Sequence, residues 1–229
     1  MIEVNDTDLL IFDCDGVLVD SEPFSLVALR TLLMHKGIRA ELPEIKLLFL
    51  GRSLKDTTRI AFERFGVSLT KEDTDSMTAG LLASLDLSLT EVLGARAFIS
   101  AIKQPYCVAS SSGIERIKRS LVASNLHDLF NDEAIFSASM VKRGKPYPDL
   151  FMKAAGDSGF HVSDCIVIED SPAGVEAGKS AGMRVIGFCG GSHVDASAHA
   201  DALMRAGADA VYDSYEKLKT VFSSFNARR

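Results

Sequence analysis

The sequence Leu9-Leu10-Ile11-Phe12-Asp13-Cys14-Asp15-Gly16-Val17 is the most informative part of this chain. Its first four residues form an apolar run typical of a buried strand, and two carboxylates follow directly. Side chains alternate along a strand, so Asp13 and Asp15 are expected on one side and Cys14 on the other. Two like charges in one small volume raise each other's pKa unless a cation relieves the repulsion. The pair therefore predicts a functional site, with a divalent metal as the candidate cation.

This stretch allows two other interpretations. A strand that ends in a polar turn without function is one, since Asp and Gly are ordinary turn residues. A calcium-binding loop is the other, but it requires glycine at the sixth position and glutamate at the twelfth. Here Gly16 is fourth and Val17 is fifth, so the calcium loop is set aside.

Further apolar runs predict the rest of the fold. Residues 106–109, 165–168, 184–187 and 210–212 read as strands, and helical patterns lie between them. This alternation predicts an α/β fold, a Rossmann-like parallel sheet with helices on both faces. Residues 21–89 show only helical periodicity, including a helix over 54–65, with Gly37 and Gly66 as expected helix ends. We therefore expect a discontinuous core of residues 1–20 and 90–229, and an inserted all-helical cap domain of residues 21–89.

Polar residues follow several of these predicted strands. In open parallel sheets, ligands bind beyond the carboxyl ends of the strands, so these residues are expected to converge. They are Asp13 and Asp15 after the first strand, Ser110-Ser111-Ser112 after the second and Glu169-Asp170-Ser171 after the third, with Lys145 in a basic loop between. Carboxylate oxygens suit Mg²⁺, whereas hydroxyl and ammonium groups suit phosphoryl oxygens. The set predicts a site for magnesium and a phosphate.

Composition fits an intracellular enzyme of ordinary type. The chain has 229 residues, of which 47% are hydrophobic and 24% charged, and its net charge is -6. This mild acidity argues against a nucleic-acid partner. No basic leader and no apolar run of roughly 18 residues is present, so a cytoplasmic location without membrane contact is expected. The four cysteines lack Cys-x-x-Cys spacing and are expected to be reduced core residues. No pattern predicts an oligomeric state.

Four motifs occur in a characteristic order. They are Asp-Cys-Asp-Gly-Val-Leu-Val-Asp-Ser from Asp13, Val108-Ala109-Ser110, Gly144-Lys145-Pro146 and Val167-Ile168-Glu169-Asp170-Ser171. In this order the chain resembles the haloacid dehalogenase-like hydrolases. The resemblance is to the subgroup with a helical cap, which includes phosphoglycolate phosphatase and beta-phosphoglucomutase, and it spans nearly the whole chain.

The resemblance implies a role for each motif. Asp13 would be the nucleophile that forms an aspartyl phosphate, and Asp15 the general acid and base. Ser110 and Lys145 would complete the neutralisation of the phosphoryl group. The substrate would be a small phosphorylated metabolite, such as a sugar phosphate, a sugar-acid phosphate or phosphoglycolate. The magnesium ligands would be Asp13, the main-chain carbonyl of Asp15 and Asp170, with Glu169 as a direct or water-mediated partner.

Several substrate-binding residues are implied with open alternatives. Residues 51–56 resemble the family's specificity loop, in which Arg52 and Lys55 would meet an anionic or hydroxylated substrate. Ser53 would contact substrate or cap the helix over 54–65. Ser111 and Ser112 would contact substrate or cap the helix that starts near Gly113.

Departures from the mutase pattern favour hydrolysis. Beta-phosphoglucomutases carry a histidine in the first cap helix, where this chain reads Glu22-Pro23-Phe24-Ser25. A haloalkanoate dehalogenase would need neither magnesium nor the second aspartate. A phosphomutase and a catalytically silent protein that binds a phosphorylated ligand are kept as alternatives, although the presence of Asp13, Asp15 and Asp170 favours an enzyme.

Overall fold

The computed structural model describes residues 4–49, 54–192 and 195–222, apart from the side chain of Lys55. The chain divides into two compact units. The core unit comprises Met1–Asp20 and Thr90–Arg229, and the helical unit comprises Ser21–Leu89. In the described residues no helix is long and apolar enough to cross a membrane.

The core unit is built on a six-stranded parallel sheet with the strand order β3-β2-β1-β4-β5-β6. The strands are β1 (Leu9–Phe12), β2 (Tyr106–Ser110), β3 (Ile135–Ser137), β4 (Cys165–Glu169), β5 (Arg184–Phe188) and β6 (Ala210–Tyr212). All five predicted strands are present, and three of them extend one residue further than predicted. The short strand β3 was not predicted.

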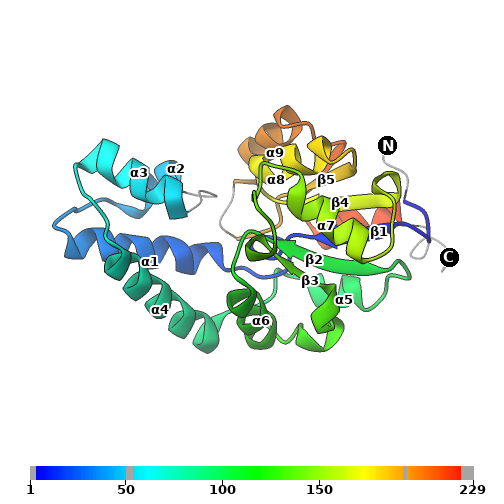
Figure 1. Ribbon diagram of the computed structural model, residues 1–229, viewed down its shortest axis with the longest axis horizontal. Helices are drawn as coiled ribbons and strands as arrows, with labels where there is room; N and C mark the ends of the chain where they lie inside the picture. Colours follow the sequence, from blue (N-terminus) through cyan, green and yellow to red (C-terminus); the bar gives the residue numbers. More distant parts are fainter. Residues whose placement is uncertain (1–3, 50–53, 193–194, 223–229) are drawn as a thin grey trace. The chain divides into compact units, whose positions relative to one another are not determined.

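The order of the strands creates a switch point at the centre of the sheet. The chain runs outward from β1 to β2 and β3, and then returns to β4 beside β1 and continues to β5 and β6. Helices of the two halves lie on opposite sides of the sheet, as Figure 1 shows for α5 and α6 on one side and α8 and α9 on the other. Their bounds are α5 (Ala95–Ile99), α6 (Ile114–Ala123), α7 (Asp149–Asp157), α8 (Pro172–Ser180), α9 (Ala196–Arg205) and α10 (Tyr215–Leu218). Ligands bind at such switch points in open α/β sheets.

The two faces of the sheet are packed differently. Aliphatic strand residues such as Ile11 and Val167 pack with buried residues of α7, α8 and α9 in one cluster. Aromatic residues fill the other side, where the ring of Phe98 on α5 lies 6.3 Å from Phe12 and 5.1 Å from Tyr215 between centroids. The alternation of side chains along each strand produces this division, because the central strands β1 and β4 are buried on both faces.

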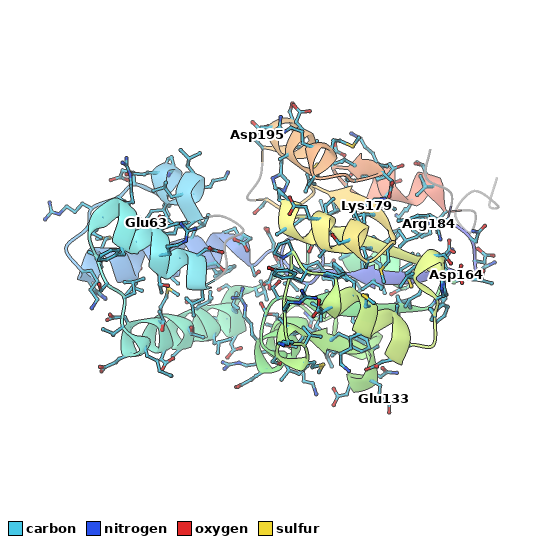
Figure 2. The ribbon with its side chains drawn as sticks, turned by 45° about the horizontal axis from the view of Figure 1, so that its top comes forward. Glu63, Glu133, Asp164, Lys179, Arg184 and Asp195 are labelled. Carbon is cyan, nitrogen blue, oxygen red and sulfur yellow. The ribbon has the colours of Figure 1, made fainter. Side chains whose placement is uncertain are left out.

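Ion pairs close the amino-terminal edge of the sheet. Arg184 at the start of β5 pairs with Asp8 before β1 at 2.7 Å, and Lys179 at the end of α8 pairs with Asp209 before β6 at 2.8 Å. Figure 2 shows Lys179 and Arg184 towards the same end of the core unit as Asp164, which precedes β4. The carboxyl edge, by contrast, carries the predicted site residues.

The helical unit contains α1 (Glu22–His35), α2 (Leu42–Phe49), α3 (Leu54–Phe65) and α4 (Lys71–Ser88). The residues after α1 and α3 include Gly37 and Gly66, whose φ angles of 81° and 68° end these helices as predicted. Buried side chains including Leu33 and Ile45 form the unit's own apolar cluster. The predicted helix over 54–65 is therefore confirmed with its bounds.

Helix α4 has a well-formed amino-terminal cap. The Thr70 hydroxyl accepts a hydrogen bond from the Asp73 amide, and the Asp73 carboxylate accepts one from the Thr70 amide. Lys36 pairs with Asp73 at 2.6 Å. The hydrogen bond from Lys36, followed by those from Thr70, lowers the pKa of Asp73 to about 2. This cap ties the start of α4 to the end of α1.

The two segments of the core unit that flank residues 21–89 pair with each other. The amide of Asp20 donates to the carbonyl of Thr90 at 3.0 Å, and the amide of Val92 donates to that of Leu18 at 2.9 Å. Val19 and Glu91 form an antiparallel bridge between them. Residues 18–20 and 90–92 thus form a short paired stem within the core unit.

Candidate active site

The turn after β1 holds the two aspartates in place. The amide of Asp13 donates to the carbonyl of Ile168 at 2.9 Å, which continues the pairing with β4. Gly16 has a φ of 82°, which a side chain would make unfavourable. The Tyr215 hydroxyl donates to the carbonyl of Val17 at 2.8 Å and anchors the far side of the turn. Cys14 is buried as predicted, and burial raises the pKa of its thiol.

Lys145 joins the predicted nucleophile to the acidic end of β4. Its Nζ lies 2.5 Å from Oδ1 of Asp13 and 2.6 Å from Oε1 of Glu169, and it donates to the carbonyl of Ala109 at 3.0 Å. The side chains of Lys145, Asp13 and Glu169 are 4%, 8% and 1% exposed. The sequence predicted that Asp13 after β1, Glu169 at the end of β4 and Lys145 in the basic loop converge. The structure brings these three residues together.

Burial and neighbouring charges shift the pKa values of this cluster in opposing directions. Burial raises the pKa of Asp13 to about 7, with smaller upward contributions from Glu169 and Asp15, while Lys145 opposes the rise. Burial alone would lower the pKa of Lys145, but the charges of Asp13 and Glu169 outweigh it and the net shift is upward. The site thus carries an excess of buried negative charge around one ammonium group.

Two donors from the segment after β2 hold Asp15. The Ser112 hydroxyl donates to Oδ2 at 2.7 Å, and Nη2 of Arg116 on α6 lies 2.9 Å from Oδ1. The alternative role of Ser112 as a helix cap is wrong, because α6 has Gly113 at its N-cap and no side-chain capping bond. Arg116 was not predicted as a site residue. The surrounding sequence does not indicate a site residue, since Glu115-Arg116 and the following Lys118-Arg119 are typical of a solvent-exposed helix face.

The remaining serines differ in placement. Ser110 ends β2 and is buried, and its hydroxyl accepts a hydrogen bond from the Ser112 amide at 3.1 Å. Ser111 is exposed. Neither Arg52 nor Ser53 lies within the described residues, and the side chain of Lys55 is outside them too. Their predicted contacts with substrate therefore stay predictions.

The end of β4 is organised around Glu169. Its Oε2 accepts hydrogen bonds from the amide and hydroxyl of Ser171, at 2.7 Å and 2.9 Å, while Oε1 faces Lys145. Gly174 in α8 leaves the necessary space, because a Cβ there would lie 1.8 Å from Oε1 of Glu169. Asp170 follows, and Nε2 of His199 contacts its carbonyl oxygen. Both Glu169 oxygens are thus engaged by protein groups.

The oxygen donors near Asp13 determine whether the predicted magnesium fits this site. In residues 4–49, 54–192 and 195–222, no three His, Cys, Asp or Glu side chains are grouped to hold a metal ion. The site that the resemblance implies has two carboxylates, from Asp13 and Asp170, and the main-chain carbonyl of Asp15, and does not require such a group. These are the hard oxygen donors that Mg²⁺ prefers, and the buried negative charge beside Asp13 is what a divalent cation neutralises. The residues therefore fit magnesium.

Comparison with known proteins identifies the family. A family model described as haloacid dehalogenase-like hydrolase matches residues 10–188, a range that includes all four motifs. The chain belongs to this family, and the predicted resemblance and fold class are confirmed.

Individual relatives define the activity more closely. The 6-phosphogluconate phosphatase of Escherichia coli (strain K12) is 35% identical over 187 residues, which cover 81% of this chain and 84% of that protein. A conserved haloacid dehalogenase-like protein of unknown function from Agrobacterium tumefaciens str. C58 has a solved structure with a TM-score of 0.84 and 33% identity, covering 94% of this chain and 97% of that one. Other matching relatives also carry phosphatase names. The chain is thus a phosphatase of small phosphorylated metabolites, which confirms the predicted enzyme class.

A further solved structure is informative about ligands. The HAD family hydrolase from Deinococcus radiodurans R1 was crystallised with bound phosphate and sodium. It is 29% identical, has a TM-score of 0.77, and covers 95% of this chain and 98% of that one.

Proposed function

We propose that this protein is a magnesium-dependent phosphatase that hydrolyses a sugar phosphate or sugar-acid phosphate through an aspartyl phosphate on Asp13. The observation that carries the proposal is the position of Lys145, which lies within 2.5 Å of Asp13 and 2.6 Å of Glu169 at the switch point between β1 and β4. The similarity to 6-phosphogluconate phosphatase supports a sugar-acid phosphate as the first substrate to test.

The reaction divides into two displacements. In the first, a carboxylate oxygen of Asp13 forms a bond to phosphorus as the bond to the leaving oxygen breaks, and that oxygen takes a proton from Asp15. In the second, water attacks phosphorus and gives a proton to Asp15, the aspartyl bond breaks, and inorganic phosphate is released. Oδ1 of Asp13 faces Lys145, and the described residues provide no hydrogen-bond donor to Oδ2. Oδ2 is therefore the oxygen we assign to the attack.

Charge neutralisation is the main requirement of phosphoryl transfer. Lys145 supplies a fixed positive charge beside the nucleophile, and Ser110 supplies a hydroxyl at the end of β2. Asp13, Asp170 and the carbonyl of Asp15 would hold magnesium, and Glu169 would orient Lys145 beside it. When bound, the magnesium ion reduces repulsion between a carboxylate and a phosphate dianion. We assign selection of the rest of the substrate to residues 21–89, acting as a cap, with Arg52 and Ser53 in its specificity loop.

The proposal is tested by measuring phosphate release from a panel of sugar phosphates, sugar-acid phosphates and phosphoglycolate, with and without magnesium. Asp13→Asn is the informative variant. Asp128→Asn is its matched control, since Asp128 is a half-exposed carboxylate of the same unit that pairs with Arg96 at 2.6 Å. We expect release to require magnesium and Asp13, and to be unaffected at Asp128. Release that persists in Asp13→Asn would contradict the aspartyl-phosphate route, and saturable binding without any release would indicate a silent binding protein.

A further inference from the structure

Asp15 is held by two groups from one short segment. Oδ2 accepts a hydrogen bond from the Ser112 hydroxyl, and Oδ1 accepts one from Nη2 of Arg116, so both carboxylate oxygens are engaged. The segment itself is fixed, because the Ser137 hydroxyl donates to the carbonyl of Ser112 at 2.8 Å and Ser110 accepts from its amide. The arrangement connects α6 directly to the turn after β1.

Arg116 differs from the other basic residues of α6. Lys118 pairs with Asp132 at 2.8 Å, but these side chains are 42% and 77% exposed. Exposed pairs of this kind contribute little. Arg116 and Asp15, in contrast, are 24% and 16% exposed, so their charge-assisted hydrogen bond is partly shielded from water. Arg116 is the basic residue of this helix that points into the site.

We propose that Arg116 is a positioning residue that orients the Asp15 carboxylate for proton transfer to the leaving oxygen. This inference rests on the proposed function, in which Asp15 is the general acid and base. A free aspartate rotates about two side-chain bonds, and fixing its carboxylate reduces the entropy cost of reaching a productive geometry. Arg116 can only donate hydrogen bonds, so it stays on Oδ1, whereas the Ser112 hydroxyl can donate or accept. Oδ2 is therefore the oxygen available for proton exchange.

The test uses two generic substrates of similar size, phenyl phosphate and 4-nitrophenyl phosphate, at saturating magnesium. Phenoxide is a more basic leaving group than 4-nitrophenoxide, so its departure depends more on an acid. For Arg116→Gln we expect kcat/KM to fall by about 10-fold or more with phenyl phosphate but by less than about 3-fold with 4-nitrophenyl phosphate, as for a general-acid step. For Arg116→Lys, kcat/KM with phenyl phosphate should lie between the values for the wild type and Arg116→Gln. Arg119→Gln, on the same helix and paired with Glu115, is the matched control and should change neither value.

A double variant separates positioning from a merely structural role. In an Asp15→Asn background, Arg116→Gln should cause no further loss with phenyl phosphate, the compound on which its own effect is large, because that effect acts through Asp15. An equal loss with both substrates, or a further loss in the Asp15→Asn background, would overturn the inference. Thermal unfolding checks that each variant is folded. If Arg116→Gln is unfolded, the inference is tested on Arg116→Lys, through its ratio of kcat/KM for phenyl phosphate to kcat/KM for 4-nitrophenyl phosphate.

Failure of this inference is distinguishable from failure of the proposed function. If the wild-type hydrolysis depends on Asp13 but the substrate ratio is unchanged in Arg116→Gln, only the role of Arg116 is wrong. If Asp13→Asn hydrolyses both compounds as fast as the wild type, the proposed function is wrong and the assignment of Arg116 with it.

Discussion

The Asp13→Asn substitution should make the free energy of unfolding less sensitive to pH. Burial raises the pKa of Asp13 from 3.8 to about 7 in the folded protein. The folded state therefore keeps a proton that the unfolded chain has already lost. For such a group, stability is fully present below the unfolded-state pKa and declines as pH rises through the folded-state pKa. Asparagine has nearly the same shape and cannot titrate, so the variant lacks this decline.

The magnitude follows from the two pKa values. One unit of pKa difference corresponds to about 1.4 kcal/mol, and the shift from 3.8 to about 7 is roughly three units. Integrating the linkage relation from about pH 5 to about pH 8 gives a loss of about 2–3 kcal/mol for the wild type that the variant does not share. The stability of Asp13→Asn relative to the wild type should increase by that amount over this range.

The assay is urea unfolding at about pH 5 and about pH 8, with a chelator to keep both proteins free of metal. Asp73→Asn is the control. Its carboxyl has a pKa lowered to about 2, so it is ionised in both folded and unfolded states throughout this range and its effect on stability should be constant. A constant difference between Asp13→Asn and the wild type would refute the argument that burial raises the pKa of Asp13.

Three further predictions concern the cluster and the helical unit. Lys145→Met should lose phosphate release and cost about 3–5 kcal/mol in urea unfolding at neutral pH, because it leaves two buried carboxylates without their cation; wild-type stability would argue against that cost. Gly174→Ala should cost about 1–3 kcal/mol and reduce activity, since its Cβ would meet Glu169. Gly156→Ala in α7, with open space around it, should instead stabilise by up to about 1 kcal/mol, and equal effects at both glycines would contradict the steric reason. Thr70→Ala should lower the stability of the helical unit by about 1 kcal/mol in thermal unfolding through loss of the α4 cap, and an unchanged midpoint would show that the cap is unimportant.

The fold was largely predictable because five of the strands are apolar runs followed by polar or glycine-bearing turns. Strand β3 was missed for a physical reason. Like β6 it has three residues, but Ile135–Ser137 lies directly between two short 3-10 helices, so no loop sets it apart from its surroundings. Residues 135–137 form a strand because they pair with the neighbouring strand β2, for example Ala109 with Phe136.

The site was predictable where it depends on strand ends and less so where it depends on helices. The strand rule predicted that Asp13 and Glu169 converge, and the motif order placed Lys145 with them. It could not predict Arg116, because the direction of a helical side chain is set by how the helix packs against a distant turn. Ser112 was missed as an Asp15 donor for a related reason. A serine before a helix is a common N-cap, and only the tertiary structure shows that its hydroxyl turns to Asp15 instead.

The paired stem of residues 18–20 and 90–92 has a consequence for how this enzyme can change. Hydrogen bonds such as that from Asp20 to Thr90 hold the two ends of the insertion together within the core unit. Closing such a stem costs little more for a long insertion than for a short one, because loop entropy grows only slowly with length. We therefore expect that residues 21–89 can be exchanged, shortened or lengthened while the pairing of β1 with β2 and β4 is unchanged. In the proposed function, residues 21–89 select the substrate and the core unit breaks the bond, so these two properties would lie on parts of the chain that can evolve at different rates.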